Sequence, residues 1–208
     1  MIGMESEPGG DRSRAVRSLE AAFLLDGDGR RLEGAAEVWL VRHGACYDGS
    51  ADPTLDDPPL SPRGREQARR LAARLKRVGF DAVHSSPLRR ALETARILAP
   101  EVRVDDRLVE VGIEVRDGRL AVVEPADRVR QRVRAAVDAA IEAHPGGRIV
   151  VVAHALAILA YVTDVMRLDL GDLRLLPYYT SVSVVRALGE RRMVGSLADV
   201  AHLEAGPS

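Results

Sequence analysis

The sequence has little of several residue types, and each shortage excludes a class of protein. Cys46 is the only cysteine among 208 residues, so no intrachain disulfide can form and nothing indicates an oxidising compartment. The most apolar stretch, Ile149 to Val162, is shorter than the roughly 20 residues that a membrane span requires. The start of the chain lacks a basic leader followed by an apolar segment. We therefore expect a cytoplasmic protein with no membrane partner.

The chain also lacks an excess of basic charge. Thirty basic residues balance thirty-one acidic ones, which leaves a formal net charge of -1 and no overall field to attract nucleic acid. Lys76 is the only lysine and asparagine is absent, so the positive charge belongs to arginine, which suits planar two-pronged contacts with phosphate or carboxylate. Any anion site must therefore be local, and we expect no nucleic-acid partner.

The N-terminal part differs in composition from the rest of the chain. Residues 1–36 are rich in glycine, arginine and acidic residues, which indicates an appendage with a flexible start or a hairpin at FLLDGDGRRLEG. From residue 37 the pattern is regular, and a hydrophobic content of 46% is enough for one buried core. We expect a single domain over residues 37–208, either as a monomer or as a homodimer.

Short apolar runs alternate with stretches of helical periodicity from residue 37 onward. The expected strands are EVWLV, DAVHSS, RIVVVAH and, near the end, SVSVVRAL and RRMVGSL. The expected helices begin at Pro62, Pro87, Pro125 and Ala155, and the third runs to Ala143. Ser61 and Ser86 precede the first two helices as N-caps, and Gly79 ends the first. This alternation predicts a three-layer α/β/α sandwich with a mostly parallel central sheet.

Polar residues follow two of the expected strands at the point where each strand ends. Arg42 and His43 end the first, and His154 ends the strand RIVVVAH. Ligands in such folds collect beyond the carboxyl ends of the strands, so the two histidines should converge. The segment SSPLRRA would bring Arg89 or Arg90 to the same edge, together with the free N–H groups of a helix start. These groups together would form a pocket for a phosphate-sized anion.

Each of these residues taken alone has an ordinary structural explanation. A histidine within an apolar run, such as His154, is often a hydrogen-bonded core residue. Arginines at a helix start, such as Arg89 and Arg90, are often surface charges. The functional interpretation depends on all of them falling at strand ends on one edge of the sheet.

At these positions the sequence resembles the histidine phosphatase superfamily, the branch that includes cofactor-dependent phosphoglycerate mutases and many small phosphatases. The resemblance runs from Val38 to about Leu203, so it implies a phosphoglycerate mutase-like fold for nearly the whole domain. It is carried by the blocks LVRHG, PLSPRGREQA, SSPLRRALETA, RLVEVGIEVRDG and VVVAHALAI, with weaker similarity at DRVRQRV and at the ending ADVAHL.

The resemblance implies a phosphomonoester hydrolase, a histidine acid phosphatase-type enzyme that needs no cofactor and no metal. His43 would attack the phosphate of a small phosphorylated metabolite and form a phosphohistidine that water then hydrolyses. Arg42, Arg90 and His154 would bind and stabilise the phosphoryl group. Glu110 would be the proton donor, with Glu114 as its rival. The remaining substrate contacts would come from Gly44, Arg132 and Ala155.

The chemistry of the residues agrees with these roles. A nucleophilic imidazole must be neutral, and nearby cations disfavour its protonated form, so Arg42 and Arg90 should lower the pKa of His43. The same two arginines would repel a metal ion bound by His43 and His154. Cys46 is a poor candidate for the nucleophile because its flanking sequence lacks the glycine-rich donor loop expected of a cysteine phosphatase.

Several positions depart from the family pattern. Ala155 follows His154 where glycine is usual, and the segment after Gly44 reaches Gly49 without the usual asparagine. The chain after Glu110 is compact and lacks the long insertion with which mutases enclose a phosphoglycerate. These changes favour hydrolysis, because a mutase must exclude water from its intermediate. Two alternatives stay open: a phosphoglycerate mutase-like enzyme, and a catalytically weak protein that binds a phosphorylated ligand.

Overall fold

The computed structural model describes residues 21–26, 28–47, 57–116, 119–170 and 172–204. Their centre is a six-stranded sheet in the order β3-β2-β6-β1-β7-β8. The first four of these strands are mutually parallel, whereas β7 is antiparallel to β1 and β8 is antiparallel to β7. The strands are β1 (Ala36–Arg42), β2 (Ala82–Ser85), β3 (Arg103–Val104), β6 (Arg148–Ala153), β7 (Val182–Leu188) and β8 (Arg191–Asp199). The mostly parallel sheet predicted from the sequence is thus confirmed.

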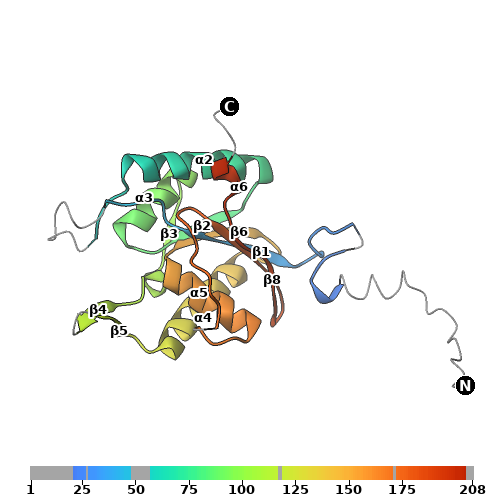
Figure 1. Ribbon diagram of the computed structural model, residues 1–208. Helices are drawn as coiled ribbons and strands as arrows, with labels where there is room; N and C mark the ends of the chain where they lie inside the picture. The colour runs from blue at the N-terminus through green and yellow to red at the C-terminus, as the bar shows by residue number, and fades with distance from the viewer. Residues whose placement is uncertain (1–20, 27, 48–56, 117–118, 171, 205–208) are drawn as a thin grey trace, which may run out of the picture.

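Helices cover both faces of this sheet (Figure 1). One layer holds α2 (Pro62–Val78) and α3 (Arg89–Leu98), with the short α6 (Ala201–Glu204) against α2. The other layer holds α4 (Ala126–Ala143) and α5 (Ala155–Met166). The three-layer α/β/α sandwich is therefore also confirmed.

The strands divide the core into two clusters because successive side chains of a strand point to opposite faces. Val38 and Leu40 of β1 pack with the apolar residues of α4 and α5, whereas Trp39 and Val41 pack with those of α2 and α3. β6 lies between β2 and β1 and is buried on both faces, which explains its continuous apolar run.

The start of α2 follows the sequence prediction and that of α3 does not. Ser61 caps α2, its Oγ accepting the Gly64 N–H, and Gly79 ends the helix with a φ of 75°. α3 begins at Arg89, two residues after the predicted Pro87, with Leu88 as its N-cap residue. Ser86 accepts the Leu88 N–H but caps no helix, and the same hydroxyl bonds a histidine of the site.

The segment between α3 and α4 contains structure that the sequence pattern did not predict. A short 3₁₀ helix, η1 (Asp106–Leu108), is followed by the strands β4 (Ile113–Arg116) and β5 (Arg119–Val122). These two strands pair with each other as an antiparallel hairpin, separate from the central sheet. The hairpin leaves the body of the domain on the side of the α4 and α5 layer (Figure 1).

Residues 21–35 precede β1 and contain a chain reversal. Leu25 and Arg31 form an antiparallel bridge, and the Leu32 N–H donates to the Leu24 carbonyl. Leu24 is buried, so this part of the predicted appendage packs on the domain. The first 20 residues of that appendage lie outside the described part. No described helix is long and apolar enough to cross a membrane.

Candidate active site

His43 lies directly after β1, where the strand delivers it to the carboxyl edge of the sheet. Its side chain is buried, with 5% of the residue exposed. The ring Nδ1 lies 2.8 Å from the carbonyl oxygen of Gly44, which can only accept a hydrogen bond, so Nδ1 carries the proton. Nε2 has no hydrogen-bond partner among the described residues and, in a neutral ring, keeps its lone pair. The backbone thus selects the nitrogen that is available as a nucleophile.

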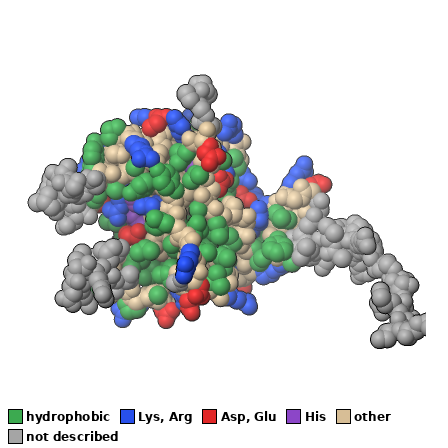
Figure 2. Space-filling model, in the orientation of Figure 1, with side chains coloured by type: hydrophobic (Ala, Val, Ile, Leu, Met, Phe, Trp, Pro, Cys, Tyr) green, Lys and Arg blue, Asp and Glu red, His purple; other side chains and the backbone are tan. Residues whose placement is uncertain are grey.

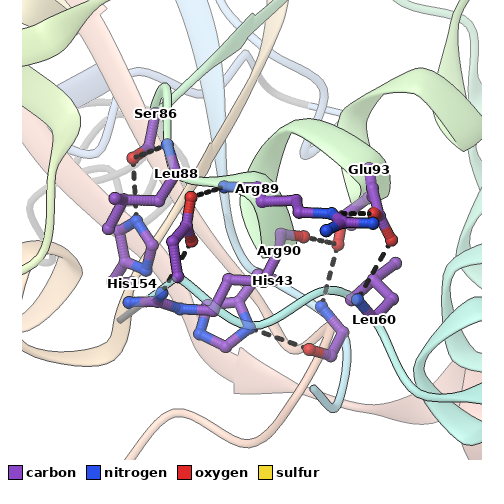
Figure 3. Close-up of polar contacts among 11 residues, drawn as sticks. His43, Leu60, Ser86, Leu88, Arg89, Arg90, Glu93 and His154 are labelled. Atoms are coloured by element: carbon purple, nitrogen blue, oxygen red, sulfur yellow. Dashed lines mark hydrogen bonds and ion pairs between the residues drawn. The ribbon is translucent and has the colours of Figure 1, made fainter. Parts of the chain in front are cut away.

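His154 lies beside His43 because β1 and β6 are adjacent and in register. Arg42 pairs with Ala153 in the ladder, so the next residue of each strand is a histidine. The ring centroids are 5.1 Å apart. The two histidines thus converge, as their positions at strand ends predicted (Figure 3). Nε2 of His154 lies 2.8 Å from Ser86 Oγ, and its Nδ1 is buried without a partner in the described structure.

Two arginines approach this histidine pair with different partners of their own. Arg42 Nη1 donates to the Pro177 carbonyl at 2.7 Å, and its guanidinium carbon lies 4.1 Å from the centroid of the Tyr179 ring. Arg90 Nη1 lies 3.3 Å from Asp57 Oδ1 and forms an ion pair with it. Figure 2 shows histidine and basic side chains together at one side of the molecule, between the two helical layers. The site therefore has the positive charge that an anion requires.

The sequence analysis expected free N–H groups at the start of α3, and the first of them is bonded to a carboxylate of the protein. The Arg89 N–H, the first of the helix, donates to Asp57 Oδ2 at 2.7 Å. The Arg89 side chain turns to Glu93 instead of the histidines, with Nε 2.8 Å from Glu93 Oε1. Of the two arginines left open by the sequence, Arg90 is therefore the one at the site.

Both histidines are uncharged at neutral pH. Burial, followed by the charges of Arg90 and Arg42, lowers the pKa of His43 to about 3, although the hydrogen bond with Gly44 acts in the opposite direction. Burial, followed by Arg90, lowers the pKa of His154 to about 2. The sequence analysis attributed the effect on His43 to the arginines alone, whereas burial is the larger cause. A neutral nucleophile is consistent with phosphoryl transfer.

The Glu110 side chain lies at the N-terminus of α5, the helix whose N-cap residue is His154. Its Oε1 accepts the Val111 N–H at 2.9 Å and the Ala157 N–H at 3.2 Å, and Oε2 lies 3.4 Å from the Leu156 N. Unpaired N–H groups at a helix start hold a carboxylate in a fixed position. Glu114, the rival for the proton-donor role, belongs to β4, and its side chain lies outside the described part.

Arg132 has its guanidinium occupied by protein groups. It forms a two-pronged ion pair with Glu124, both bonds being 2.8 Å long, and Nη1 donates to the carbonyls of Arg107 and Val109 at 2.7 Å. These bonds tie α4 to the segment that carries Glu110. Its charge reaches His154 as a minor contribution to the lowered pKa of that ring. A direct contact between Arg132 and substrate stays a prediction.

Gly44 has both backbone groups bonded within the protein, and its contact with substrate also stays a prediction. Its N–H donates to Thr94 Oγ1 at 3.0 Å, and its carbonyl accepts from His43. A Cβ at this position would lie 2.6 Å from the Gly64 carbonyl oxygen, because the loop after β1 packs directly on the first turn of α2. The glycine is explained by this close approach.

Thr94 and Gln67 belong to the site region, and the sequence analysis missed both. Thr94 Oγ1 donates to the Arg90 carbonyl at 2.7 Å while accepting the Gly44 N–H, so it links α3 to the loop that carries His43. Gln67 Oε1 accepts the Ala45 N–H at 2.9 Å. The available signal was a polar residue on the buried stripe of each helix, since such a group needs a specific partner.

One of the family departures, Ala155, falls at this edge of the sheet. Ala155 is the first residue of α5, and its N–H donates to no described acceptor. An anion bound there could accept a hydrogen bond from it. Gly49 lies outside the described residues. Cys46 pairs with Leu60 in an isolated bridge, as part of the contact between the loop after β1 and the segment before α2.

Comparisons of the sequence with known proteins agree on one family. The profile of the histidine phosphatase superfamily (branch 1) matches residues 38–122 and 114–200. A probable phosphoglycerate mutase of Cronobacter sakazakii is 29% identical over 206 residues, which cover 81% of this chain and 95% of that protein. A 2,3-bisphosphoglycerate-dependent phosphoglycerate mutase of Thermoplasma acidophilum is 37% identical over 89 residues; this match spans 39% of the chain and less than half, 44%, of that protein.

Solved structures share the fold. YhfR of Bacillus stearothermophilus superposes with a TM-score of 0.68 at 26% identity, covering 81% of this chain and 99% of that one. The phosphoserine phosphatase of Entamoeba histolytica in complex with 3-phosphoglyceric acid gives the same TM-score at 20% identity and the same coverage. The second likeness extends to the fold alone.

Proposed function

This chain belongs to branch 1 of the histidine phosphatase superfamily, and from that premise we propose that it is a metal-independent phosphomonoester hydrolase with His43 as the nucleophile. The observation that carries the proposal is the state of His43. Its Nδ1 proton is fixed on the Gly44 carbonyl, and burial and two arginines keep the ring neutral, so the Nε2 lone pair is available.

The first step transfers the phosphoryl group to the protein. Nε2 of His43 attacks phosphorus, the N–P bond forms, and the bond from phosphorus to the ester oxygen breaks. The departing oxygen takes a proton from Glu110, which must be in its carboxylic acid form when the substrate is bound. In the second step Glu110 accepts a proton from water, the water oxygen bonds to phosphorus, and the N–P bond breaks. Inorganic phosphate leaves, and both side chains return to their starting states.

The surrounding cations suit the transition state of this transfer. A phosphoryl group in flight carries negative charge on its equatorial oxygens, which fixed donors stabilise without reorganisation. Arg42 and Arg90 supply the charge, and His154, with an unpartnered Nδ1, lies 5.1 Å from His43 between ring centroids. The Ala155 N–H, at the positive end of the α5 dipole, is a further donor within the same edge of the sheet.

A phosphoglycerate mutase is the second candidate function. It is favoured by the name of the Cronobacter relative, whose length this chain nearly covers. Against it, β4 and β5 follow Glu110 closely and form a short hairpin, where a mutase needs an enclosure that keeps water from the phosphohistidine. We therefore favour a hydrolase that acts on small phosphorylated metabolites such as sugar phosphates, phosphoglycerates or nucleotides.

The proposal is tested by measuring phosphate release from a panel of phosphorylated metabolites and phosphopeptides in the presence of EDTA. His43→Asn is the matched control, because its side-chain amide can still donate to the Gly44 carbonyl but cannot form a phosphohistidine. We expect turnover by the wild-type protein and none by the variant. Interconversion of phosphoglycerates that depends on a bisphosphate primer would favour the mutase. Ligand affinity without turnover in the wild type would indicate a binding protein.

A further inference from the structure

Arg42 lacks the carboxylate partner that arginines near an active site often have. No acidic side chain of the described residues pairs with it, whereas Arg90 is paired with Asp57. Its orientation is fixed by neutral groups: the Pro177 carbonyl at 2.7 Å and the Tyr179 ring, whose centroid lies 4.1 Å from the guanidinium carbon. A cation held on the face of an aromatic ring keeps its N–H edge and its full charge for an anion.

Tyr179 reaches the nucleophile as well. Its ring centroid lies 5.7 Å from that of His43, so this one aromatic side chain lies beside both the Arg42 guanidinium and the attacking imidazole. Arg42 Nε and Nη2 donate to no described residue. In the orientation that the ring imposes, the arginine therefore keeps N–H donors that can bind an anion.

The residue after Tyr179 has a strained backbone. Thr180 has a φ of 58°, in the left-handed region that a β-branched residue rarely adopts. Its N–H is shared between the carbonyl oxygens of Arg42, at 3.0 Å, and His43, at 3.3 Å. The unfavourable conformation is thus coupled to the backbone of the two site residues, and it turns the chain so that Tyr179 covers Arg42.

His202 supports this strained residue from the end of the domain. Thr180 Oγ1 donates to the Tyr179 carbonyl at 2.7 Å and lies 3.0 Å from His202 Nε2. A threonine hydroxyl has one proton, so His202 Nε2–H is the donor in the second bond. His202 is buried on α6, within the ending ADVAHL that no catalytic step uses.

We propose that Tyr179 is a positioning residue that orients the Arg42 guanidinium for the phosphoryl group, and that Thr180 and His202 hold Tyr179 in place. The inference rests on the proposed function, because it assigns Arg42 to phosphate. It gives the C-terminal His202, distant from the histidine pair in sequence, a role in phosphate binding.

The test compares Tyr179→Phe, which keeps the ring, with Tyr179→Leu, which keeps an apolar side chain without π electrons. Binding of inorganic phosphate is measured by calorimetry, and KM and kcat are measured on the best substrate of the panel. We expect Tyr179→Leu to weaken phosphate binding and to raise KM by about tenfold, the size of a desolvated cation–π contact. We expect Tyr179→Phe to stay within about twofold of the wild type on the same basis.

A double-mutant cycle shows whether Tyr179 acts through Arg42. In an Arg42→Met background, Tyr179→Leu should cause no further loss of phosphate affinity, because the cation that it orients is gone. His202→Gln, which retains a donor near the Nε2 position, should bind phosphate normally, and His202→Leu should share the Tyr179→Leu defect. Urea unfolding of each variant verifies that it is folded.

The outcomes separate the two proposals. Normal phosphate affinity in folded Tyr179→Leu, or an equal loss in both arginine backgrounds, would overturn the inference alone. A wild-type protein that neither binds inorganic phosphate nor releases it from any ester would overturn the proposed function and the inference with it.

Discussion

At the scale of single residues, the two arginines of the site differ in the groups that hold them. Arg90 is paired with Asp57 and lies at the start of a helix, whereas Arg42 meets a carbonyl and an aromatic ring. Both lower the pKa of His43, yet only Arg42 has no acidic partner in the described structure. A strand can therefore end on an arginine and a histidine, because burial keeps the histidine neutral and removes their mutual repulsion.

Glu110 allows a residue-scale prediction that distinguishes a proton donor from a structural carboxylate. Glu110→Gln keeps an oxygen for the Val111 and Ala157 N–H groups but cannot supply a proton. For alkyl phosphates, whose leaving oxygen needs a proton, we expect kcat to fall by about 10²- to 10⁴-fold. For p-nitrophenyl phosphate, whose leaving group is stable as an anion, we expect a much smaller loss.

The control for this prediction is Arg90→Met, which removes a cation beside the two histidines and leaves the contacts of Glu110 unchanged. It should reduce the rates for both classes of substrate alike. An equal loss on alkyl and p-nitrophenyl esters in Glu110→Gln would contradict the proton-donor role and would direct attention to Glu114.

At the scale of elements, the loop after β1 is held by side chains from the second turns of two helices. Thr94 of α3 accepts the Gly44 N–H, and Gln67 of α2 accepts the Ala45 N–H. Gly64 lies so close that a Cβ there would clash with the Ala45 carbonyl oxygen. The start of α2 therefore serves the site as well as the helix.

Ser61 carries that double role, which gives a prediction for α2. Its Oγ accepts the Gly64 N–H at 3.1 Å and donates to the Ala45 carbonyl at 3.0 Å. Ser61→Ala removes both bonds, and we expect the free energy of unfolding to fall by about 1–2 kcal/mol, as for other lost N-caps. Urea unfolding measures this change.

Arg69→Ala is the comparison, because it removes an exposed ion pair on the same helix. The free energy of unfolding should stay the same within error in this variant. A Ser61→Ala protein as stable as the wild type would show that neither bond of Ser61 contributes.

Local signals predicted most elements and failed where a tertiary contact decides. Ser61, Pro62 and Gly79 fixed both ends of α2, because capping and backbone conformation are local properties. The same reasoning placed the start of α3 two residues early, since Ser86 is used by His154 and Leu88 instead of by a helix. The hairpin of β4 and β5 has no partner in the central sheet, and its short strands gave no clear periodicity.

The sequence predicted the part of the site that strand order determines. His43 and His154 follow neighbouring strands, so topology alone brings them together. Asp57 at the start of α3 and Tyr179 over Arg42 come from loops whose paths no periodic pattern encodes.

At the scale of the whole molecule, buried histidines predict sensitivity to mild acid. Burial lowers the pKa of His43 to about 3, of His154 to about 2 and of His202 to about 4, against 6.5 in an unfolded chain. Below pH 6.5 the unfolded state therefore binds protons that the folded state does not. The stability is fully present above pH 6.5 and is lost as the pH falls toward the folded values.

At pH 5 each of the three histidines should lower the free energy of unfolding by about 2 kcal/mol relative to pH 7. Carboxylates contribute little in this window because they titrate at lower pH. Urea unfolding at both pH values measures the loss, and His202→Gln should reduce it by about one third, since one of the three groups no longer titrates. Equal stability at pH 5 and pH 7 would mean that these rings are not buried in the neutral form.

The most direct test of the account is to trap the phosphorylated protein. The wild-type enzyme is mixed with a ³²P-labelled substrate, quenched in base within milliseconds, digested and analysed by mass spectrometry. We predict acid-labile label on the peptide that contains His43, and none in His43→Asn. Label on another residue, or continued turnover by His43→Asn, would contradict the assignment of His43 as the nucleophile.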